Sequence, residues 1–401
     1  MEITQLKEQN TPLSFEDTSI AFAHKSNKEL RKMYWLFAMM NRRWMVKTGT
    51  GFVKQALRFR LPLVKWAVKS TVFDHFCGGQ SIEDSQHTID LLDKFNIGTI
   101  LDYSVEGEKN ESSFDHTTQE TIRTIEKASQ QSEKIPFSVF KVTGVASFDL
   151  MAKIQAGETL TDAEQQAWEK ARQRVNQICQ KASEHKVRIF IDGEETWIQD
   201  TIDQLTYEMM KKYNQEMPIV YNTYQMYRTA SLENLKAAFE EAEKENYWLG
   251  AKLVRGAYME KERARAEEKG YADPIQPNKA ASDKDFDAGL QFCMEQRHRI
   301  ALCAGTHNEQ SSMLLTQLIT QYNLPKNDPN VYFSQLFGMS DHISFNLAKA
   351  GYNVAKYVPY GPVASVMPYL IRRADENTSV AGQSSREFML ISKEKKRRKN
   401  S

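Results

Sequence analysis

Residues 248–258 read Trp-Leu-Gly-Ala-Lys-Leu-Val-Arg-Gly-Ala-Tyr, an apolar run that two cations interrupt and a glycine closes. A short apolar run bounded by glycine is typical of a buried β-strand. Because strand side chains alternate between faces, Lys252 and Arg255 leave on opposite sides, and both can border the strand's carboxyl end. Gly256 allows a close backbone approach there. Two cations suit an anionic cofactor, although a plain basic strand end with a turn glycine is equally compatible with the pattern.

Similar short apolar runs recur from about residue 97 onward, separated by polar helical segments. Eight strands alternating with helices predict an α/β fold of the (β/α)₈ barrel type. An open doubly wound sheet is the alternative, but no GxGxxG follows the first strand. The predicted strands are Gly98–Tyr103, Phe137–Lys141, Val187–Asp192, Pro218–Asn222, Leu249–Arg255, Arg299–Ala304, Val331–Gln335 and Val354–Val358. The clearest helices are Thr161–His185, Asp200–Asn214, Ala230–Glu245, Asp283–Gln296 and Glu309–Tyr322.

Each predicted strand stops at polar side chains, which would form a ring at one mouth of the barrel. Barrel enzymes carry their chemistry at this carboxyl-terminal face. The strand-end residues, in order, are Asp102, Lys141, Asp192, Asn222, Lys252 with Arg255, Thr306 with His307, Gln335, and Tyr357. We therefore expect the active site at this mouth.

Composition limits the class of protein. The chain has 401 residues, 41% hydrophobic and 26% charged, and a net charge of +1, which gives no general attraction to nucleic acid. It contains no run of about 18 apolar residues, the length needed to span a bilayer. The amino terminus resembles neither a secretory signal nor a transit peptide, which favours a cytoplasmic location. Four scattered cysteines and the absence of HExxH, His-x-His or CxxC motifs predict reduced thiols and no metal.

The pattern divides the chain into three parts. Residues 1–95 form an N-terminal helical region with candidate helices Leu30–Thr48 and Gly51–His75, and residues 96–380 form the barrel. Residues 381–401 are a C-terminal segment with a basic cluster at 393–399. We expect this tail to be a disordered, solubilising end, with attraction to anionic lipid as the alternative.

The stretch Tyr369-Leu-Ile-Arg-Arg-Ala-Asp-Glu376 follows the eighth strand. If it is helical, its tyrosine, both arginines and Glu376 share one face, and Pro368 kinks or starts the helix. Paired guanidiniums suit a carboxylate, whereas a solvated face with local ion pairs is the simpler interpretation. With Tyr357 nearby, the position over the mouth favours a small pocket for a ring-bearing amino acid.

Three further strand-end residues leave several roles open. Lys141 beside Asp192 could form a Schiff-base pair, a cofactor clamp or a structural ion pair. His307, in Ala304-Gly-Thr-His-Asn308, is a lone histidine, and such residues are more often structural than catalytic.

Residues 97–380 resemble the proline dehydrogenases, flavoenzymes on a distorted (βα)₈ barrel that holds FAD. The resemblance rests on the 248–258 stretch, on Tyr369-Leu-Ile-Arg-Arg-x-x-Glu376 and on Ile191-Asp-Gly-Glu-Glu195. It is closest to the monofunctional, mitochondrial-type members. It implies that the second oxidation of the pathway needs a separate pyrroline-5-carboxylate dehydrogenase.

The resemblance also implies residue roles. Arg372 and Arg373 would bind the proline carboxylate with help from Lys141. The remaining substrate and catalytic positions would be Asp192, Tyr258, Tyr357, Tyr369 and Glu376. The FAD-binding positions would be Asn222, Lys252, Arg255, Thr306, His307 and Gln335. Lys252 stands where some members carry arginine, and Asn222 replaces a longer amide, so the detail at both positions can differ from the family.

The implied reaction is hydride transfer from C5 of L-proline to FAD, giving Δ1-pyrroline-5-carboxylate, with electrons passed to a quinone. A peripheral contact at the inner face of the membrane would accompany that acceptor. Oxidation of hydroxyproline or another cyclic imino acid is the alternative on the same fold. A Schiff-base aldolase using Lys141 and a non-catalytic membrane-surface protein using the basic tail are the alternatives from other classes.

Overall fold

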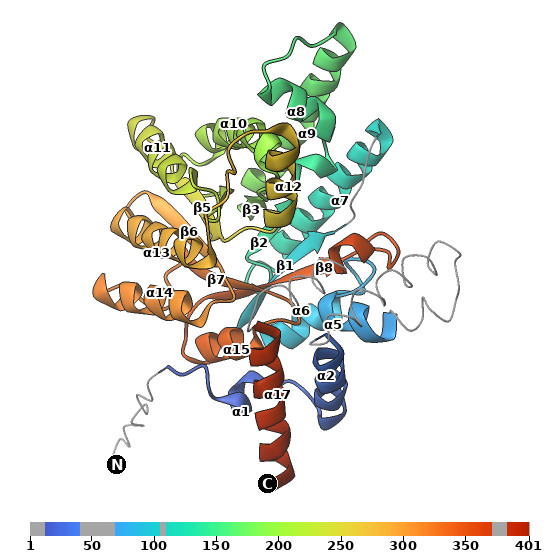
Figure 1. The fold of residues 1–401 in the computed structure, drawn as a ribbon, viewed down its shortest axis with the longest axis vertical. Coiled ribbons are helices and arrows are strands. Elements are labelled where there is room, and N and C mark those ends of the chain that lie inside the picture. The colour runs from blue at the N-terminus through green and yellow to red at the C-terminus, as the bar shows by residue number, and fades with distance from the viewer. Residues whose placement is uncertain (1–12, 41–68, 105–109, 371–382, 401) are drawn as a thin grey trace.

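The computed structural model describes residues 13–40, 69–104, 110–370 and 383–400, and eight parallel strands close into a barrel in chain order (Figure 1). The strands are β1 (Ile97–Tyr103), β2 (Phe137–Phe140), β3 (Arg188–Ile191), β4 (Val220–Gln225), β5 (Leu249–Val254), β6 (Ile300–Gly305), β7 (Val331–Leu336) and β8 (Val354–Tyr360). Pairing of β1 with β8, from Ile97↔Val354 to Tyr103↔Tyr360, completes the ring. The predicted (β/α)₈ barrel is confirmed.

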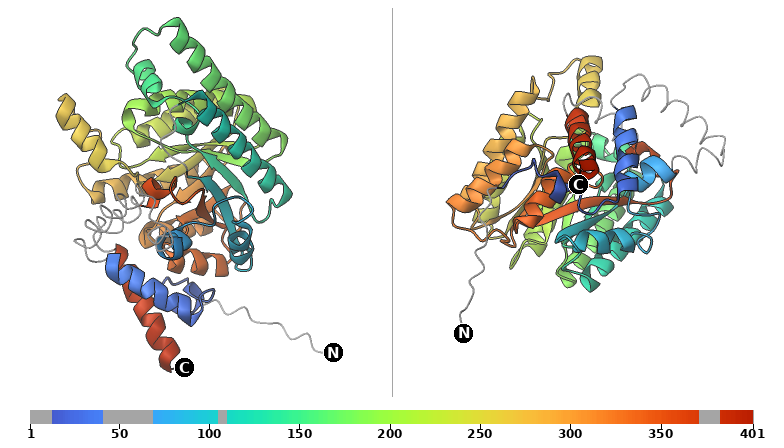
Figure 2. Two further views of the ribbon diagram at one scale, coloured as in Figure 1. Left: turned by 90° about the vertical axis from the view of Figure 1, so that its right-hand side faces the viewer. Right: turned by 90° about the horizontal axis from the view of Figure 1, so that it is seen from below.

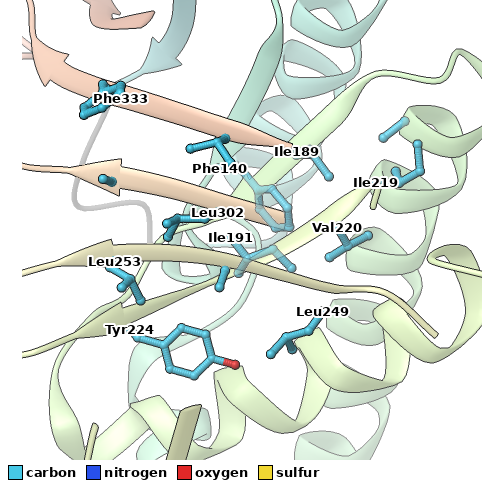
Figure 3. Close-up of a cluster of buried hydrophobic side chains, with 14 of the residues drawn as sticks. Phe140, Ile189, Ile191, Ile219, Val220, Tyr224, Leu249, Leu253, Leu302 and Phe333 are labelled. Atoms are coloured by element: carbon cyan, nitrogen blue, oxygen red, sulfur yellow. The ribbon is translucent and has the colours of Figure 1, made fainter. Parts of the chain in front are cut away.

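Helices surround the barrel, as expected when each parallel strand returns to the sheet through a crossover. In chain order they are α7 (Glu111–Gln130), α8 (Phe148–Gln155), α9 (Asp162–Glu184), α10 (Thr196–Tyr213), α11 (Ser231–Lys244), α12 (Met259–Lys269), α13 (Lys279–Glu295), α14 (Glu309–Gln321) and α15 (Asp341–Lys349). The main apolar core lies between strands and helices, where alternate strand residues such as Ile189, Leu253 and Phe333 point outward (Figure 3).

A second, smaller cluster fills the inside of the barrel. The Phe137 ring on β2 packs on Phe190 of β3, and it also meets Tyr332 of β7 at a centroid distance of 4.9 Å. Strands β2 and β7 are not neighbours, so this contact crosses the barrel interior. Period-two alternation therefore sends one set of side chains to the helices and the other inward, toward the mouth.

Two strands run further than the sequence pattern predicted. β4 continues past the predicted end at Asn222 to Gln225, and β8 continues past Val358 to Tyr360. Polar residues can stay in these strands because each is buried with a partner. The Thr223 hydroxyl donates to the Ile191 carbonyl at 2.7 Å, and the Gln225 amide donates to the Glu194 carbonyl at 2.6 Å. Tyr357 is thus an inward-pointing strand residue and not a strand terminus.

The terminal segments pack together beside the barrel. They are α1 (Thr18–Ala21) and α2 (Asn27–Met40) from the N-terminal side and α17 (Gln383–Asn400) from the C-terminal side. Two short helices, α5 (Asp74–Phe76) and α6 (Gln86–Asp93), lie between α2 and the barrel in the sequence. In two views α2 and α17 lie side by side (Figure 2), and the Tyr34 and Phe388 rings meet at 4.9 Å. The predicted helix Leu30–Thr48 is observed to Met40, whereas most of Gly51–His75 lies outside the described residues. In the described part of the chain, no helix is long and apolar enough to cross a membrane.

The expectation that residues 393–399 form a disordered end is wrong, because they belong to α17. The Glu394 carboxylate is fully buried and accepts hydrogen bonds from Arg397 and Arg398. Arg398 in turn donates to the carbonyl oxygens of Phe22 and Lys25 at 2.7 Å each. Glu394 and Arg398 of the cluster therefore help to hold α17 against the N-terminal segment.

Candidate active site at the barrel mouth

The centre of the mouth is an ion pair between Lys252 and Asp192, joined by the Tyr357 hydroxyl. The Lys252 ammonium donates to the Asp192 carboxylate and to the Tyr357 oxygen, the latter at 2.6 Å. These residues come from β5, the end of β3 and β8, which are not neighbouring strands. They can meet only across the barrel interior, so the structure brings together three residues that the sequence assigned to one site.

Aromatic rings form the walls around this ammonium group. Lys252 lies 5.1 Å from the Phe190 ring centroid and 4.9 Å from that of Tyr357, distances typical of cation–π attraction. The Lys252 side chain is only 4% exposed and that of Asp192 15% exposed, so the pair is shielded but reachable from the mouth. Burial and the Asp192 charge raise the pKa of Tyr357 well above its usual value, which keeps the phenol protonated as a hydrogen-bond donor or acceptor.

Arg255 reaches the mouth from the other face of β5, as alternation predicted. Its three nitrogens donate to Asp283 at 2.6 Å, to the Thr306 hydroxyl at 2.7 Å and to the Ser311 hydroxyl at 2.9 Å. The guanidinium also stacks over the Phe286 ring at 4.4 Å. These contacts hold a cation in a fixed orientation beside the end of β6.

Strand ends β6 and β7 are joined by a chain of hydrogen bonds. Gln335 donates its amide to the Thr306 carbonyl at 3.1 Å and accepts from the Ser344 hydroxyl at 2.8 Å. One residue further on, the Nδ1 atom of His307 shares a hydrogen bond of 2.9 Å with the Ser340 hydroxyl. Arg255, Thr306, His307 and Gln335 therefore form one connected polar face of the mouth.

Glu194 is a functional candidate that the sequence-based assignment missed. Its carboxylate accepts from the Thr143 backbone N–H at 3.0 Å and from the Thr143 hydroxyl at 2.5 Å, next to Lys141 on the β2 side. Burial raises its pKa to about 7, although Lys141 and Thr143 oppose that shift. The Ile191-Asp-Gly-Glu-Glu195 motif contained the signal, since an acidic run after a buried strand has to lie at the mouth.

Asn222 points into the outer helix layer, away from the Lys252–Asp192 pair. Its amide donates to Asp203 at 2.9 Å and lies 3.4 Å from the Tyr207 hydroxyl, both on α10 in the outer helix layer. To contact a cofactor in the mouth, the side chain would have to leave these partners.

Two tyrosines and the arginine pair complete the candidate set. Tyr258 is half-buried at the start of α12, and Tyr369 is buried in an apolar cluster with Phe76, Met339 and Val366. Residues 367–370 are helical, so Pro368 falls in a first turn, where its missing N–H is tolerated. Arg372, Arg373 and Glu376 lie outside the described residues.

The donor set of the mouth fits an anionic, hydrogen-bonding cofactor. At the strand ends, Lys252 lies inside the barrel beside aromatic rings of β3 and β8. Arg255 lies on the other face of β5, connected to Thr306 and through it to Gln335. Among the described residues, no group of three or more His, Cys, Asp or Glu side chains could hold a metal ion. Fold and polar strand ends together are those of a (β/α)₈-barrel enzyme.

The chain belongs to the proline dehydrogenase family, which confirms the resemblance inferred from its motifs. The family's sequence model, described as proline dehydrogenase, matches residues 85–386. Mitochondrial proline dehydrogenase 1 of Dictyostelium discoideum is 33% identical, with 95% of this chain and 74% of that protein covered. Hydroxyproline dehydrogenase of Xenopus laevis is 30% identical, with 96% and 90% covered. The human mitochondrial proline dehydrogenase 1 is 42% identical over 58% of this chain and 39% of its own length.

Solved structures agree on the fold. Proline utilization A from Bdellovibrio bacteriovorus, inactivated by N-propargylglycine, superposes with a TM-score of 0.75 at 19% sequence identity. The superposition covers 92% of this chain and 42% of that chain, so this protein corresponds to about two fifths of the longer one.

The ion pair at the centre of the mouth generates a first prediction. Asp192→Ala alone leaves the Lys252 charge buried without a carboxylate and should lower the free energy of unfolding by about 3 kcal/mol. In a Lys252→Met background, the same substitution should cost less than about 1 kcal/mol, because no buried charge remains. Urea unfolding of the four proteins of this cycle measures the difference. Equal costs in both backgrounds would mean that the two groups are not coupled.

The buried carboxylate of Glu194 generates a second prediction. Its pKa is about 7 in the folded protein and near 4.5 when exposed, so the folded state holds a proton that the unfolded state releases in this window. The extra proton stabilises the folded protein fully below pH 4.5. As the pH rises from 4.5 through about 7, the free energy of unfolding should fall by roughly 3 kcal/mol. Glu194→Gln should remove this loss. The test compares urea midpoints of both proteins from pH 4.5 to 8, and parallel curves would contradict the assignment.

Proposed function

We propose that this chain oxidises L-proline to Δ1-pyrroline-5-carboxylate, with FAD held in the barrel mouth. Family membership supports the reaction, and one observation carries the placement of its site. Lys252, Asp192 and Tyr357 meet across the barrel interior, and Arg255, Thr306, His307 and Gln335 form a connected polar face at the carboxyl ends of β5, β6 and β7.

Within this proposal the two sides of the mouth have different tasks. Lys252, Arg255, Thr306, His307 and Gln335 would hold the cofactor, and bound FAD would supply the hydride acceptor. Buried cations near the flavin would stabilise negative charge that develops on its ring. Asn222 is kept as a family-derived candidate only, because its amide is engaged by α10.

Substrate recognition would depend on the opposite side. Arg372 and Arg373, with Lys141, would bind the proline carboxylate, and Glu376 would orient the two guanidiniums. Tyr357, Tyr369 and Tyr258 would enclose the ring and exclude water. Holding the ring carbon next to the acceptor is the main contribution the protein can make to such a transfer.

Turnover tests the proposed reaction directly. Purified protein supplied with FAD should reduce a soluble quinone analogue when L-proline is added, and the product should react with o-aminobenzaldehyde as a cyclic imine. D-proline should be a poor substrate, because its carboxylate would point away from the arginines. Protein that binds FAD but turns over no cyclic imino acid would contradict the proposal.

Oxidation of hydroxyproline is a second candidate, favoured by the similarity to the Xenopus hydroxyproline dehydrogenase over 96% of the chain. Tyr357 is the position that would discriminate, since its hydroxyl already contacts Lys252 and Asp192 and would compete with a ring hydroxyl. The ratio of kcat/KM for L-proline and trans-4-hydroxy-L-proline decides between the two substrates.

The arginine pair generates a third prediction. Arg372→Met or Arg373→Met should raise KM for L-proline at least tenfold, as the loss of a charged hydrogen bond worth about 1.5–3 kcal/mol would. Flavin content should stay near that of the wild type, because these residues serve the substrate. If either variant keeps the KM of the wild type, the substituted arginine does not bind the substrate carboxylate.

We also propose that electrons pass to a membrane quinone and that the face formed by α2 and α17 contacts an anionic bilayer. Trp35 is 66% exposed, Met39 43% and Met389 56%, and all three lie on these two packed helices. From residue 30 to residue 73 the sequence has ten Lys or Arg and no Asp or Glu. Tryptophan and basic side chains together favour the membrane interface.

A separate pyrroline-5-carboxylate dehydrogenase would complete the pathway.

This surface generates a fourth prediction. The wild type should co-sediment with vesicles of phosphatidylglycerol, and binding should weaken in high salt. Trp35→Ser combined with Met389→Ser should reduce binding severalfold. Met259→Ser is the control, because Met259 is also an exposed methionine, at 43%, but lies on α12. Equal loss in the control, or equal binding to neutral vesicles, would contradict an electrostatic contact at this face.

A further inference from the structure

The C-terminal helix α17 contacts the segment between β7 and α15 through a buried carboxylate. Glu387 is 2% exposed, and its carboxylate accepts the backbone N–H of Ser340, which is itself 1% exposed. Ser340 is the residue whose hydroxyl contacts His307. A two-step path therefore leads from α17 to a residue of the polar face.

Ser340 has a backbone conformation that a residue other than glycine rarely adopts. Its φ of 51° and ψ of 41° are left-handed, a region that costs a non-glycine residue free energy unless the surroundings fix it. Ser340 precedes α15 but makes no side-chain cap there, because its hydroxyl is turned to Nδ1 of His307. The Ser344 hydroxyl also lies 3.3 Å from the Ser340 carbonyl oxygen and 2.8 Å from Gln335.

Two neighbouring residues of α17, Arg386 and Glu387, contact the segment that contains His307 and the segment that contains Ser340. Arg386 donates to the two carboxylate oxygens of Glu309 at 2.8 and 3.2 Å, and Glu309 begins α14 two residues after His307. Glu387 holds the loop before α15 through Ser340. His342 connects the two sides, with Nε2 at 3.0 Å from Glu309 and Nδ1 at 3.9 Å from Glu387.

We propose that Glu387 is a positioning residue that orients His307 through Ser340 and in this way sets the affinity of the mouth for FAD. The inference rests on the proposed flavin site. It adds that a helix outside the barrel, and not only the strand ends, determines the geometry of that site. Without the Glu387 carboxylate, Ser340 would relax out of the left-handed region and turn its hydroxyl away from His307.

The test measures FAD binding to apo protein by the quenching of flavin fluorescence, at a temperature well below unfolding. Glu387→Ala should raise the Kd for FAD about tenfold, as expected if His307 then adopts its binding orientation only about a tenth of the time. Glu387→Gln should restore most of the affinity, because its amide oxygen can still accept the Ser340 N–H. Ser340→Gly should weaken binding as much as Glu387→Ala, since glycine keeps the left-handed backbone but removes the hydroxyl.

The matched control is Glu394→Ala. Glu394 is an equally buried carboxylate of α17, but its partners Arg397 and Arg398 lead to the N-terminal segment and not to the mouth. It should lower Tm and leave the Kd within about twofold. Equal Kd values for wild type, Glu387→Ala and Ser340→Gly, or a loss in Glu394→Ala as large as theirs, would overturn the positioning role while leaving the flavin site intact. Wild-type apo protein that binds no FAD would overturn the proposed function itself.

Discussion

Closure of the eight-stranded barrel is the constraint on which the rest of the structure depends. Because β1 pairs with β8, alternate side chains of every strand share one interior, and residues of distant strands must be mutually compatible there. The Lys252 charge can be buried in that interior only because Asp192 and Tyr357 reach it from two other strands. A change of register in β3, β5 or β8 would separate this cation from its partners, so the proposed reaction centre depends on the fold.

Buried hydrogen bonds connect the residues at the ends of β5, β6 and β7. Arg255 is fixed by Asp283, Thr306 and Ser311, and Thr306 is linked through Gln335 to Ser344. Such networks are stabilising only when every member is satisfied, and then they restrict each side chain to one orientation. A preorganised mouth of this kind lowers the cost of positioning cofactor and substrate, which is where a barrel scaffold can contribute most to a transfer reaction.

The sequence predicted the barrel well because burial leaves a direct pattern. All eight strands were placed within a few residues, and the cations of the 248–258 stretch lie on opposite faces as alternation requires. Partners that depend on tertiary contacts could not be predicted. The partner of Asn222 is one example, since Asp203 on α10 lies 19 residues away in the sequence. The basic tail was predicted to be disordered from its charge, because the Glu394 carboxylate and the Phe22 and Lys25 carbonyls that accept hydrogen bonds from its arginines come together only in the fold.

The central claim is that the mouth holds a flavin that L-proline reduces, and an anaerobic titration of the FAD-loaded protein tests it most directly. The account predicts that the visible flavin absorption is lost as L-proline is added, and that it returns when a quinone analogue is supplied. Flavin absorption that stays unchanged at saturating L-proline, in protein that retains its FAD, would contradict the account.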